Sequence, residues 1–417
     1  MDIIALLKDF VTGLTKAGQD FFDHPENFRQ LEQTVTDLSH KAAADYLAMT
    51  LSQMDEMICG SGLRIGRYKV VRHDQRTLIT TAGDVTFTHT LFLDPKEGCR
   101  RYLLDEMLHL PDRERFSTQA EARVLSEAEV HSYQHAADSL QIGQQKVSRT
   151  AVMHKVHEMV GTLPPEEPIP DDQKKQCRYL YIDADEDHIP SQKEKTGKNC
   201  FIGKLVYLYE GRRAISKGRT ELVAPHYFSG LYEGSSGNAE LWQSVEKYIE
   251  EHYDSDVLKK VYINGDGGSW IRAGVDYVNH SVFVADRFHL MKYINRAASY
   301  TLDECEATRE RFYKYICQNK LPAAMELLTR IQDHCDGSDK AVAECRSYLV
   351  NNWDAIQRAF HDKHVIGCSA EGHVSNVLSD RMSSRPMGWS KAGSDRMCRL
   401  RSYVRNNSLL SKSQGGN

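Results

Sequence analysis

A short acidic stretch that follows an apolar strand constrains this chain more than any other feature. Residues 179–189 read Tyr-Leu-Tyr-Ile-Asp-Ala-Asp-Glu-Asp-His-Ile, so four β-favouring residues lead directly into four carboxylates. Burying grouped carboxylates is unfavourable because they repel one another and lose hydration. Such a group is tolerated where it stays hydrated, where the chain turns, or where a cation occupies it. The stretch therefore predicts either a solvated loop after a core strand or a cation site.

Strand periodicity indicates which of these carboxylates act together. If the strand continues, Asp183, Asp185 and Asp187 project from one face and Glu186 points away from it. Grouped hard oxygen ligands suit Mg²⁺ or Mn²⁺. Because Asp183 and Asp185 share a face, the spacing leaves both open as the first ligand.

Two further acids lie where they can join this group. Asp266 closes a predicted strand in the sequence Gly265-Asp266-Gly267, and Glu371 precedes a predicted helix. Ligands of open α/β sheets collect at strand ends, so these carboxylates can meet at one edge. Two aspartates and a glutamate can hold a pair of divalent ions for phosphoryl transfer. An aspartate at a strand end is also common in ordinary turns, and the spacing does not decide between the two interpretations.

Composition places the chain among globular proteins. Its 417 residues are 41% hydrophobic and 27% charged, which predicts two or three domains. No apolar run approaches the roughly 20 residues that span a membrane, and the N-terminus does not read as a secretory signal. Ten cysteines include no C-x-x-C pair, which fits a reducing cytoplasm. We therefore expect a cytoplasmic protein without a membrane partner.

The net charge of −5 hides a basic C-terminal end. Residues 371–417 hold eight Lys/Arg and three Asp/Glu, which suits either a phosphate-contacting surface or a plain solvated helix. Residues 119–160 read as two helices broken near 141–144, with a Ser148 cap, and this pattern suits a helix-turn-helix or two ordinary packed helices. The predicted DNA contacts are Arg149, Lys155, Arg381, Arg385, Arg396, Arg399 and Arg401.

The order of the predicted elements divides the chain. Strands and helices alternate through 177–295, which indicates an α/β layer with a partly parallel sheet. The predicted N-terminal parts are a mainly helical region with a small β-element (1–118), the predicted DNA-binding helices (119–160) and a proline-rich linker (161–174). A catalytic core (175–295 and 366–390) follows, interrupted by a helical insertion (296–365), and the chain closes with a basic C-terminal segment (391–417).

Four long motifs closely resemble the ISLre-type bacterial insertion-sequence transposases, which are distant relatives of the Mutator-like DDE enzymes. They are Tyr-Ile-Asp-Ala-Asp-Glu-Asp-His-Ile (181–189), Gly-Asp-Gly-Gly-Ser-Trp-Ile (265–271), Asp-Arg-Phe-His-Leu-Met-Lys-Tyr (286–293), and residues 370–390, which begin Ala-Glu-Gly-His-Val-Ser-Asn. With similar stretches at 76–85 and 102–106, the resemblance covers most of the chain.

The resemblance implies a ribonuclease-H-like core with an all-helical insertion, and metal-dependent cleavage and joining of DNA at the ends of a mobile element. Carried over by position, the acidic triad is Asp185, Asp266 and Glu371, with Asp286 and His289 in a supporting Asp-x-x-His. The motif favours Asp185 over Asp183 without excluding Asp183.

The leading hypothesis is thus a DDE transposase that uses Mg²⁺ or Mn²⁺ and acts as a homo-oligomer on element ends and target DNA. The alternatives are a catalytically silent DNA-binding remnant and a structure-specific nuclease on the same core.

Overall fold

The chain divides into two compact units, Met1–Met159 and Val160–Asn417. The computed structural model describes residues 3–140, 142, 145–163, 167–192, 200–385 and 387–414. The division falls directly before the proline-rich stretch at 161–174.

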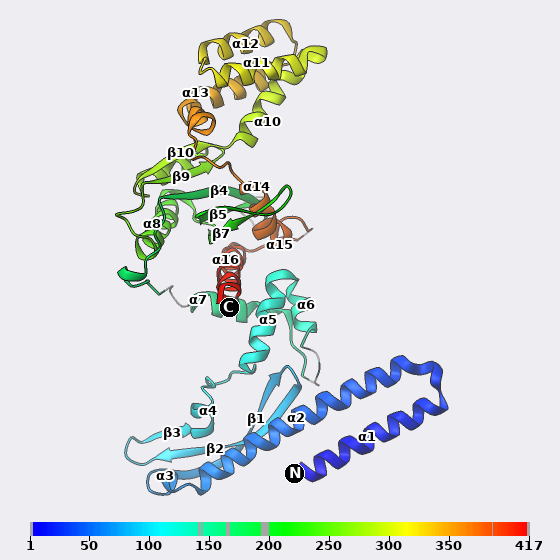
Figure 1. Ribbon diagram of the computed structural model, residues 1–417. Coiled ribbons are helices and arrows are strands. Elements are labelled where there is room, and N and C mark those ends of the chain that lie inside the picture. Colours follow the sequence, from blue (N-terminus) through cyan, green and yellow to red (C-terminus); the bar gives the residue numbers. More distant parts are fainter. Residues whose placement is uncertain are drawn as a thin grey trace. The chain divides into compact units, whose positions relative to one another are not determined.

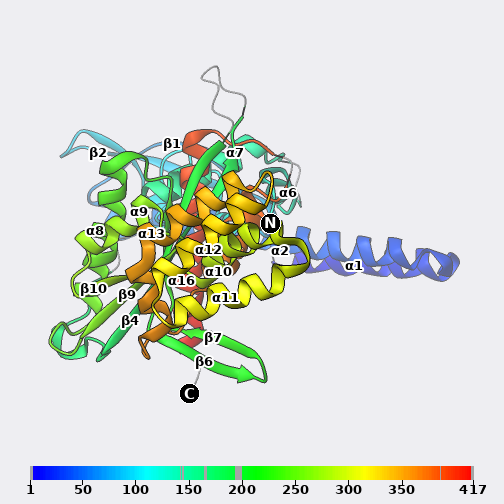
Figure 2. The same ribbon diagram turned by 90° about the horizontal axis from the view of Figure 1, so that it is seen from above.

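The first unit begins with a pair of long helices, α1 (Ile3–Asp23) and α2 (Phe28–Gly60). A 3₁₀ turn, η1 (Pro25–Asn27), separates them, because proline lacks the amide that a continuous helix needs. The two helices lie side by side in both ribbon views (Figures 1 and 2). The N-terminal helical prediction is confirmed.

A small antiparallel sheet packs against α2. Its strands β1 (Lys69–Thr80), β2 (Gly83–Asp94) and β3 (Cys99–Tyr102) run in the order β1-β2-β3, which confirms the predicted β-element. Val85 and Phe87 of β2 are buried together with Ala44 of α2. The short α3 (Gly62–Ile65) connects α2 to this sheet.

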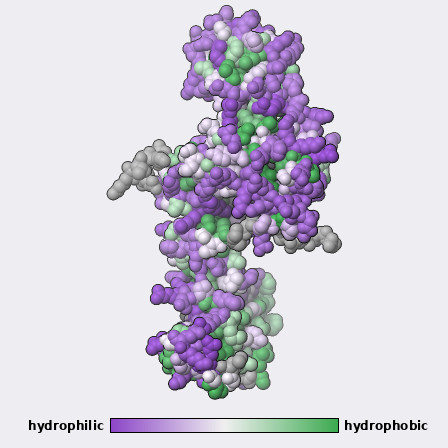
Figure 3. Space-filling model, turned by 90° about the vertical axis from the view of Figure 1, so that its left-hand side faces the viewer, coloured by the Kyte–Doolittle hydropathy of each residue, from purple (hydrophilic) through white to green (hydrophobic). Residues whose placement is uncertain are grey.

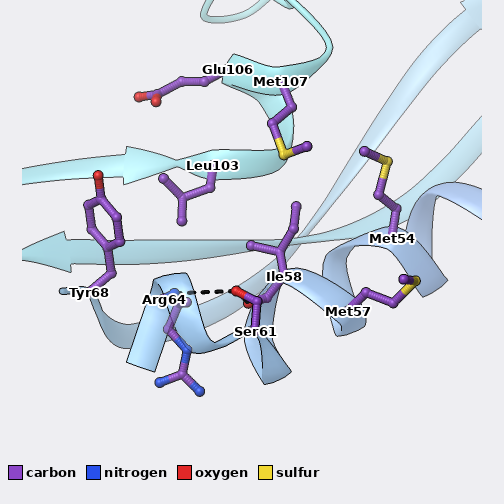
Figure 4. A pocket seen from close by; sticks show the side chains of 9 residues that line it. All are labelled: Met54, Met57, Ile58, Ser61, Arg64, Tyr68, Leu103, Glu106 and Met107. Carbon is purple, nitrogen blue, oxygen red and sulfur yellow. Dashed lines mark hydrogen bonds between the residues drawn. The ribbon is translucent and has the colours of Figure 1, made fainter. Parts of the chain in front are cut away.

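An apolar pocket of about 570 Å³ opens near the end of α2 (Figure 4). Met54, Met57 and Ile58 from α2 line it, and Leu103 and Met107 of α4 (Leu103–Met107) face them. Apolar surface among polar side chains is visible at the lower end of Figure 3, where this unit is drawn. None of the five predicted acidic site residues lines this pocket.

Three helices follow where the sequence predicted two: α5 (Thr118–Val130), α6 (Tyr133–Asp138) and α7 (Arg149–Gly161). The chain breaks after α5 because the Ser132 hydroxyl accepts the His135 amide and starts a new helix. The Ser148 cap is confirmed, since its hydroxyl accepts the Ala151 amide. Of the predicted break at 141–144, Gln141, Gly143 and Gln144 lie outside the described residues.

The second unit is built on a five-stranded mixed sheet in the order β10-β9-β4-β5-β8. Strands β10, β9 and β4 are parallel, whereas β5 pairs antiparallel with both β4 and β8. The bounds are β4 Tyr179–Pro190, β5 Cys200–Tyr209, β8 His226–Gly230, β9 Lys260–Gly265 and β10 Ser281–Ala285. The prediction of a partly parallel α/β sheet is confirmed, although β8 and the ribbon β6–β7 (Gly211–Ser216, Arg219–Val223) were not predicted.

The two faces of this sheet differ in chemistry. Leu180, Ile182 and Ala184 of β4 point into an apolar core that includes Trp242 of α8 (Gly234–His252). The alternate residues of β4 form a polar face with tyrosines from β5 and β9, where Tyr181 stacks on both Tyr209 and Tyr262. Strand alternation therefore keeps the aspartates of β4 away from the apolar core.

Helices complete the second unit (Figure 1). The stretch predicted as a helical insertion contains the end of α10 and three further helices. The helices before the last acidic motif are α9 (Ser269–Arg272), α10 (Arg287–Ala298), α11 (Cys305–Cys317), α12 (Leu321–His334) and α13 (Asp339–His361). The chain then forms α14 (Ala370–Val374), a π-helical turn (Ser375–Ser379), α15 (Asp380–Met382) and α16 (Lys391–Gln414). Among the described helices, none combines the length and hydropathy that crossing a membrane requires.

Candidate metal centre

Sheet register brings the predicted aspartates to one edge. Asp183 of β4 lies opposite Asn264 of β9, and Gly265 of β9 lies opposite Ala285 of β10. Asp185, Asp266 and Asp286 therefore follow at neighbouring positions, and the two-residue period places them on the polar face. The Asp286 amide donates to the Gly265 carbonyl oxygen at 2.9 Å, which holds the ends of β9 and β10 together.

Asp185, His289 and Glu371 form the centre of this site. One potential ligand atom from each lies within 4.8 Å of the other two. The three residues come from β4, α10 and α14, so chain segments far apart in the sequence supply them. Glu371 is exposed, whereas Asp185 and His289 are half-buried, so the group is open to a ligand from one side.

Asp286 holds the start of α10 and stands beside His289. Its carboxylate accepts the Phe288 amide at 3.0 Å as the helix cap. Its other oxygen lies 3.6 Å from Nδ1 of His289, and that nitrogen has no hydrogen-bond partner among the described residues. A carboxylate behind an imidazole is the usual way in which a protein orients a histidine ligand.

The surroundings of Asp185 disfavour its charged form. Burial, followed by the charges of Asp266, Glu371 and Glu186, raises the pKa of Asp185 to about 7, although a hydrogen bond from the Glu186 amide opposes the shift. Carboxylates that raise one another's pKa in this way are stabilised by a shared cation. Two carboxylates and one imidazole converge here, and Asp266 acts on Asp185 through its charge; such an oxygen-rich set suits a divalent ion of the Mg²⁺ or Mn²⁺ type.

The turn that carries Asp266 is tightly packed. The Asp266 carboxylate accepts the Gly268 amide at 2.8 Å. Gly267 has φ +95°, and a Cβ added there would lie 2.8 Å from Oδ1 of Asn352 on α13. Asn352 is 6% exposed, and that oxygen has no hydrogen-bond partner among the described residues. The helical region thus packs against the Asp266 turn, a contact that the sequence did not predict.

Asp183 has a different environment from Asp185. It is fully buried, and burial raises its pKa. Its carboxylate accepts from Tyr207 Oη, Asn264 Nδ2 and the Ser369 amide, each at 2.8 Å. Protein donors already surround it, so Asp183 is a positioning residue that fixes Ser369 two residues before Glu371. Of the two aspartates that the sequence leaves open as the first ligand, Asp185 lies with His289 and Glu371, whereas Asp183 accepts hydrogen bonds from the protein.

A row of four tyrosines holds the segment that leads to Glu371. Their hydroxyls, from three neighbouring strands, each bond a residue between 362 and 369 along that segment. The pairs are Tyr262 with the Asp362 carboxylate (2.9 Å), Tyr181 with the His364 carbonyl (2.9 Å), Tyr209 with the Gly367 carbonyl (3.4 Å) and Tyr207 with the Ser369 hydroxyl (2.9 Å). Sequence reasoning missed this tyrosine row, although the i, i+2 pairs Tyr179/Tyr181 and Tyr207/Tyr209 were a visible signal of a polar face.

Glu186 lies on the opposite side of β4, as predicted. Its carboxylate accepts the indole N–H of Trp270 at 2.8 Å. Trp270 is itself 9% exposed and packs with Trp242 in the core. Glu186 therefore affects Asp185 through its charge rather than by sharing its face.

The predicted DNA contacts separate into exposed and buried cations. Arg149 and Arg385 are exposed, and Arg396 is partly exposed. Arg399 is also partly exposed, but its guanidinium pairs with Asp395 at 3.0 Å and stacks over Tyr232.

Three other predicted contacts have buried side chains with protein partners, so they are not available as exposed cations. Lys155 is 9% exposed, and its ammonium pairs with three glutamates, Glu114, Glu121 and Glu158. Arg381 lies over the Trp389 ring, 4.8 Å from its centroid. Arg401 is 3% exposed and donates to the carbonyl oxygens of Asn376 and Val377 in the π-helical turn. A π-helical turn changes the regular backbone pairing, and the guanidinium serves those carbonyls.

Comparison with known proteins identifies relatives along nearly the whole chain. The model of an uncharacterised protein family, UPF0236, matches residues 23–416. Two UPF0236 proteins of Caldanaerobacter subterraneus subsp. tengcongensis are 29% and 30% identical over 411 residues, which is 98% of this chain and 84% of each relative. The name of the first joins eleven locus designations, so that genome holds it in many copies.

Among solved structures, the chain is similar to the Drosophila P element transposase strand transfer complex, with 9% identity and a TM-score of 0.26 over 74% of this chain and 84% of that one. A TM-score this low establishes no common fold. The sequence matches are decisive, and the chain belongs to the uncharacterised protein family UPF0236.

Proposed function

We propose that this protein is a DDE-type transposase of a bacterial insertion sequence. Asp185, Asp266 and Glu371 form its acidic triad, and Mg²⁺ or Mn²⁺ is its cofactor. One observation carries the proposal: Asp185 of β4 and Glu371 of α14 lie together at one polar sheet edge, where burial, followed by the charges of Asp266 and Glu371, raises the pKa of Asp185.

Two further observations support this proposal. Acidic residues at the ends of parallel strands, with a helical region between the Asp286 and Glu371 motifs, suit the ribonuclease-H-like core of the transposases that these motifs resemble. A relative encoded many times in one genome is what a mobile element leaves behind when it copies itself.

In this proposal, the residues of the site have different roles. Asp185, Asp266 and Glu371 would hold the divalent ions, which supply Lewis-acid stabilisation of charge on a phosphodiester under attack. His289 lies against Asp185 and Glu371, where it would complete the ligand set or hold a phosphate oxygen. Asp286 orients that ring, and Asp183 fixes the segment that carries Glu371.

The chemistry needs no nucleophile from the chain. Hydrolysis of a phosphodiester at the element's end leaves a 3′-hydroxyl, and that hydroxyl then attacks a phosphodiester of target DNA. Arg149 and Arg385, both exposed, are the proposed phosphate contacts. Holding two element ends together requires more than one copy of the site, so we expect a homo-oligomer on DNA.

The experiment uses purified protein and DNA that carries the element's boundaries, with and without Mg²⁺. Metal-dependent nicks at the boundary and joined products are expected, and Asp266→Asn should abolish both. Asp276→Asn is the matched control, because Asp276 is an exposed aspartate outside the site. Nicking that persists in Asp266→Asn would show that the triad is wrong. Hydrolysis without joined products would indicate a nuclease. Salt-dependent DNA binding without cleavage in Mg²⁺ or Mn²⁺ would indicate a silent DNA-binding remnant.

A further inference from the structure

The geometry points to a second metal site, in the first unit and independent of the proposed function. We infer that Glu127, His131 and His135 bind a transition-metal ion of the Zn²⁺ type at the corner between α5 and α6. One potential ligand atom from each of these residues lies within 4.8 Å of the other two.

The corner itself creates this site. In a continuous helix, residues eight positions apart are separated by about 12 Å along the axis, so Glu127 and His135 would not meet. Here α5 ends at Val130, His131 has extended backbone angles, and Ser132 caps the new helix. As a result, Nε2 of His135 lies 3.8 Å from Oε2 of Glu127.

The second histidine converges on the same carboxylate oxygen. Nε2 of His131 lies 3.9 Å from Oε2 of Glu127, and the two imidazole rings are 4.4 Å apart between centroids. Tetrahedral zinc with bonds of about 2.0–2.2 Å holds its donors about 3.3–3.5 Å apart. Both separations from the glutamate are therefore within about half an ångström of metal-bound values, and side-chain rotations can close the remaining differences.

The donor set selects the kind of ion. Two imidazoles and one carboxylate suit zinc and its neighbours, whereas Mg²⁺ prefers oxygen ligands. The three side chains are 32% (Glu127), 42% (His131) and 59% (His135) exposed, so water can supply the fourth position. A bound ion would fasten the first turn of α6 to the end of α5 and fix the angle of this corner.

The first test measures bound Zn²⁺ by equilibrium dialysis of the full-length protein in excess Mg²⁺, which occupies oxygen-rich sites. The double variant His131→Ala/His135→Ala should lose one equivalent of zinc relative to the wild type. His154→Ala, which removes an exposed histidine of α7, should lose none. The inference is overturned if the double variant binds as much zinc as the wild type.

A second variant separates this site from the sheet-edge site. Asp185→Asn/Glu371→Gln should keep the equivalent that the histidine variant loses; if it loses that equivalent instead, the zinc belongs to the other centre and the inference fails. Zinc should also raise the thermal midpoint of the wild type but not that of His131→Ala/His135→Ala. The two corner histidines are partly exposed, so His131→Ala/His135→Ala should fold, and circular dichroism of both double variants in the presence of chelator checks their folding.

Discussion

Asp183 and Asp185 are two residues apart on one face of β4, yet their neighbours give them opposite energetic roles. Asp183 is surrounded by hydroxyl and N–H donors, whereas Asp185 is surrounded by other carboxylates. Carboxylates that accept several hydrogen bonds stabilise the fold, and crowded like charges destabilise it. The same substitution should therefore change stability in opposite directions at the two positions.

We predict that Asp183→Asn lowers the free energy of unfolding of the second unit by about 1–3 kcal/mol, because an amide N–H₂ group would replace an oxygen that accepts hydrogen bonds from protein donors. Asp185→Asn should raise it by about 1–3 kcal/mol in chelator at pH 8, because one crowded charge disappears. Urea denaturation of both variants beside the wild type measures these changes. A loss of stability in Asp185→Asn would contradict the crowded-charge description of the site.

Gly267 provides a second prediction at this scale. Gly267→Ala should cost about 1–3 kcal/mol, because its backbone is left-handed and the new methyl group meets Asn352. Gly218→Ala is the matched control, since Gly218 has φ +80° but nothing within 4 Å of an added Cβ. Denaturant unfolding should show a larger loss at Gly267, partly restored by Asn352→Ala. Equal losses at both glycines would show that the contact with Asn352 has no energetic effect.

At the scale of elements, apolar strands were predictable and polar ones were not. The runs around Ile182, Leu208 and Ile263 marked β4, β5 and β9 because burial on one face demands them. Strand β8 escaped prediction because its sequence, His-Tyr-Phe-Ser-Gly, mixes polar residues into both faces of a buried strand. The tyrosine row escaped for another reason: its partners lie in a segment without periodicity, and only the fold brings that segment onto the sheet.

His226 on β8 makes the stability of the second unit depend on pH. Burial, with smaller effects from His252 and Lys175, lowers its pKa to about 3, and its ring accepts the Asn406 amide. The unfolded chain binds the proton more readily than the folded chain, so stability is lost as pH falls through the unfolded pKa. As the pH falls from 7.5 to 5.5, His226 alone should lower the free energy of unfolding by about 1.4 kcal/mol.

Urea denaturation of wild type and His226→Gln at both pH values measures this contribution. The variant is expected to be less stable at pH 7.5 but to lose less on acidification. His154→Gln, at an exposed position on α7, should leave the pH dependence unchanged. If His226→Gln keeps the full pH dependence of the wild type, other histidines cause that dependence and the prediction is wrong.

At the scale of the whole molecule, the two compact units should unfold separately. Each has its own core, around Phe87 in the first unit and around Trp242 in the second. Calorimetry should show two transitions. Phe87→Ala should lower the free energy of unfolding of the first unit and Trp242→Ala that of the second, each by about 3–5 kcal/mol. A single transition that responds to both substitutions would mean that the units unfold as one.

The candidate site was predictable at this scale only in part. Motif order placed Asp185, Asp266 and Glu371 in one site, and strand ends gave a physical reason for their meeting. The environments of the arginines were harder to predict, because Arg381 and Arg401 look like solvent-facing cations in the sequence. In the fold, an indole packs against Arg381 and two carbonyl oxygens accept from Arg401. Charge alone does not reveal such partners.

The tyrosine row has a consequence for the order in which the second unit folds. The bond from Ser369 to Asp183 spans 186 residues, and the tyrosines that support it come from β4, β5 and β9. Closing so long a loop is slow, and the segment finds its hydroxyl partners only after those strands have paired. We therefore expect the Glu371 segment to dock after those strands have paired, so that a nascent or half-folded chain carries carboxylates that are still far apart. If the protein cuts DNA as proposed, it would be inactive until its synthesis and folding are complete.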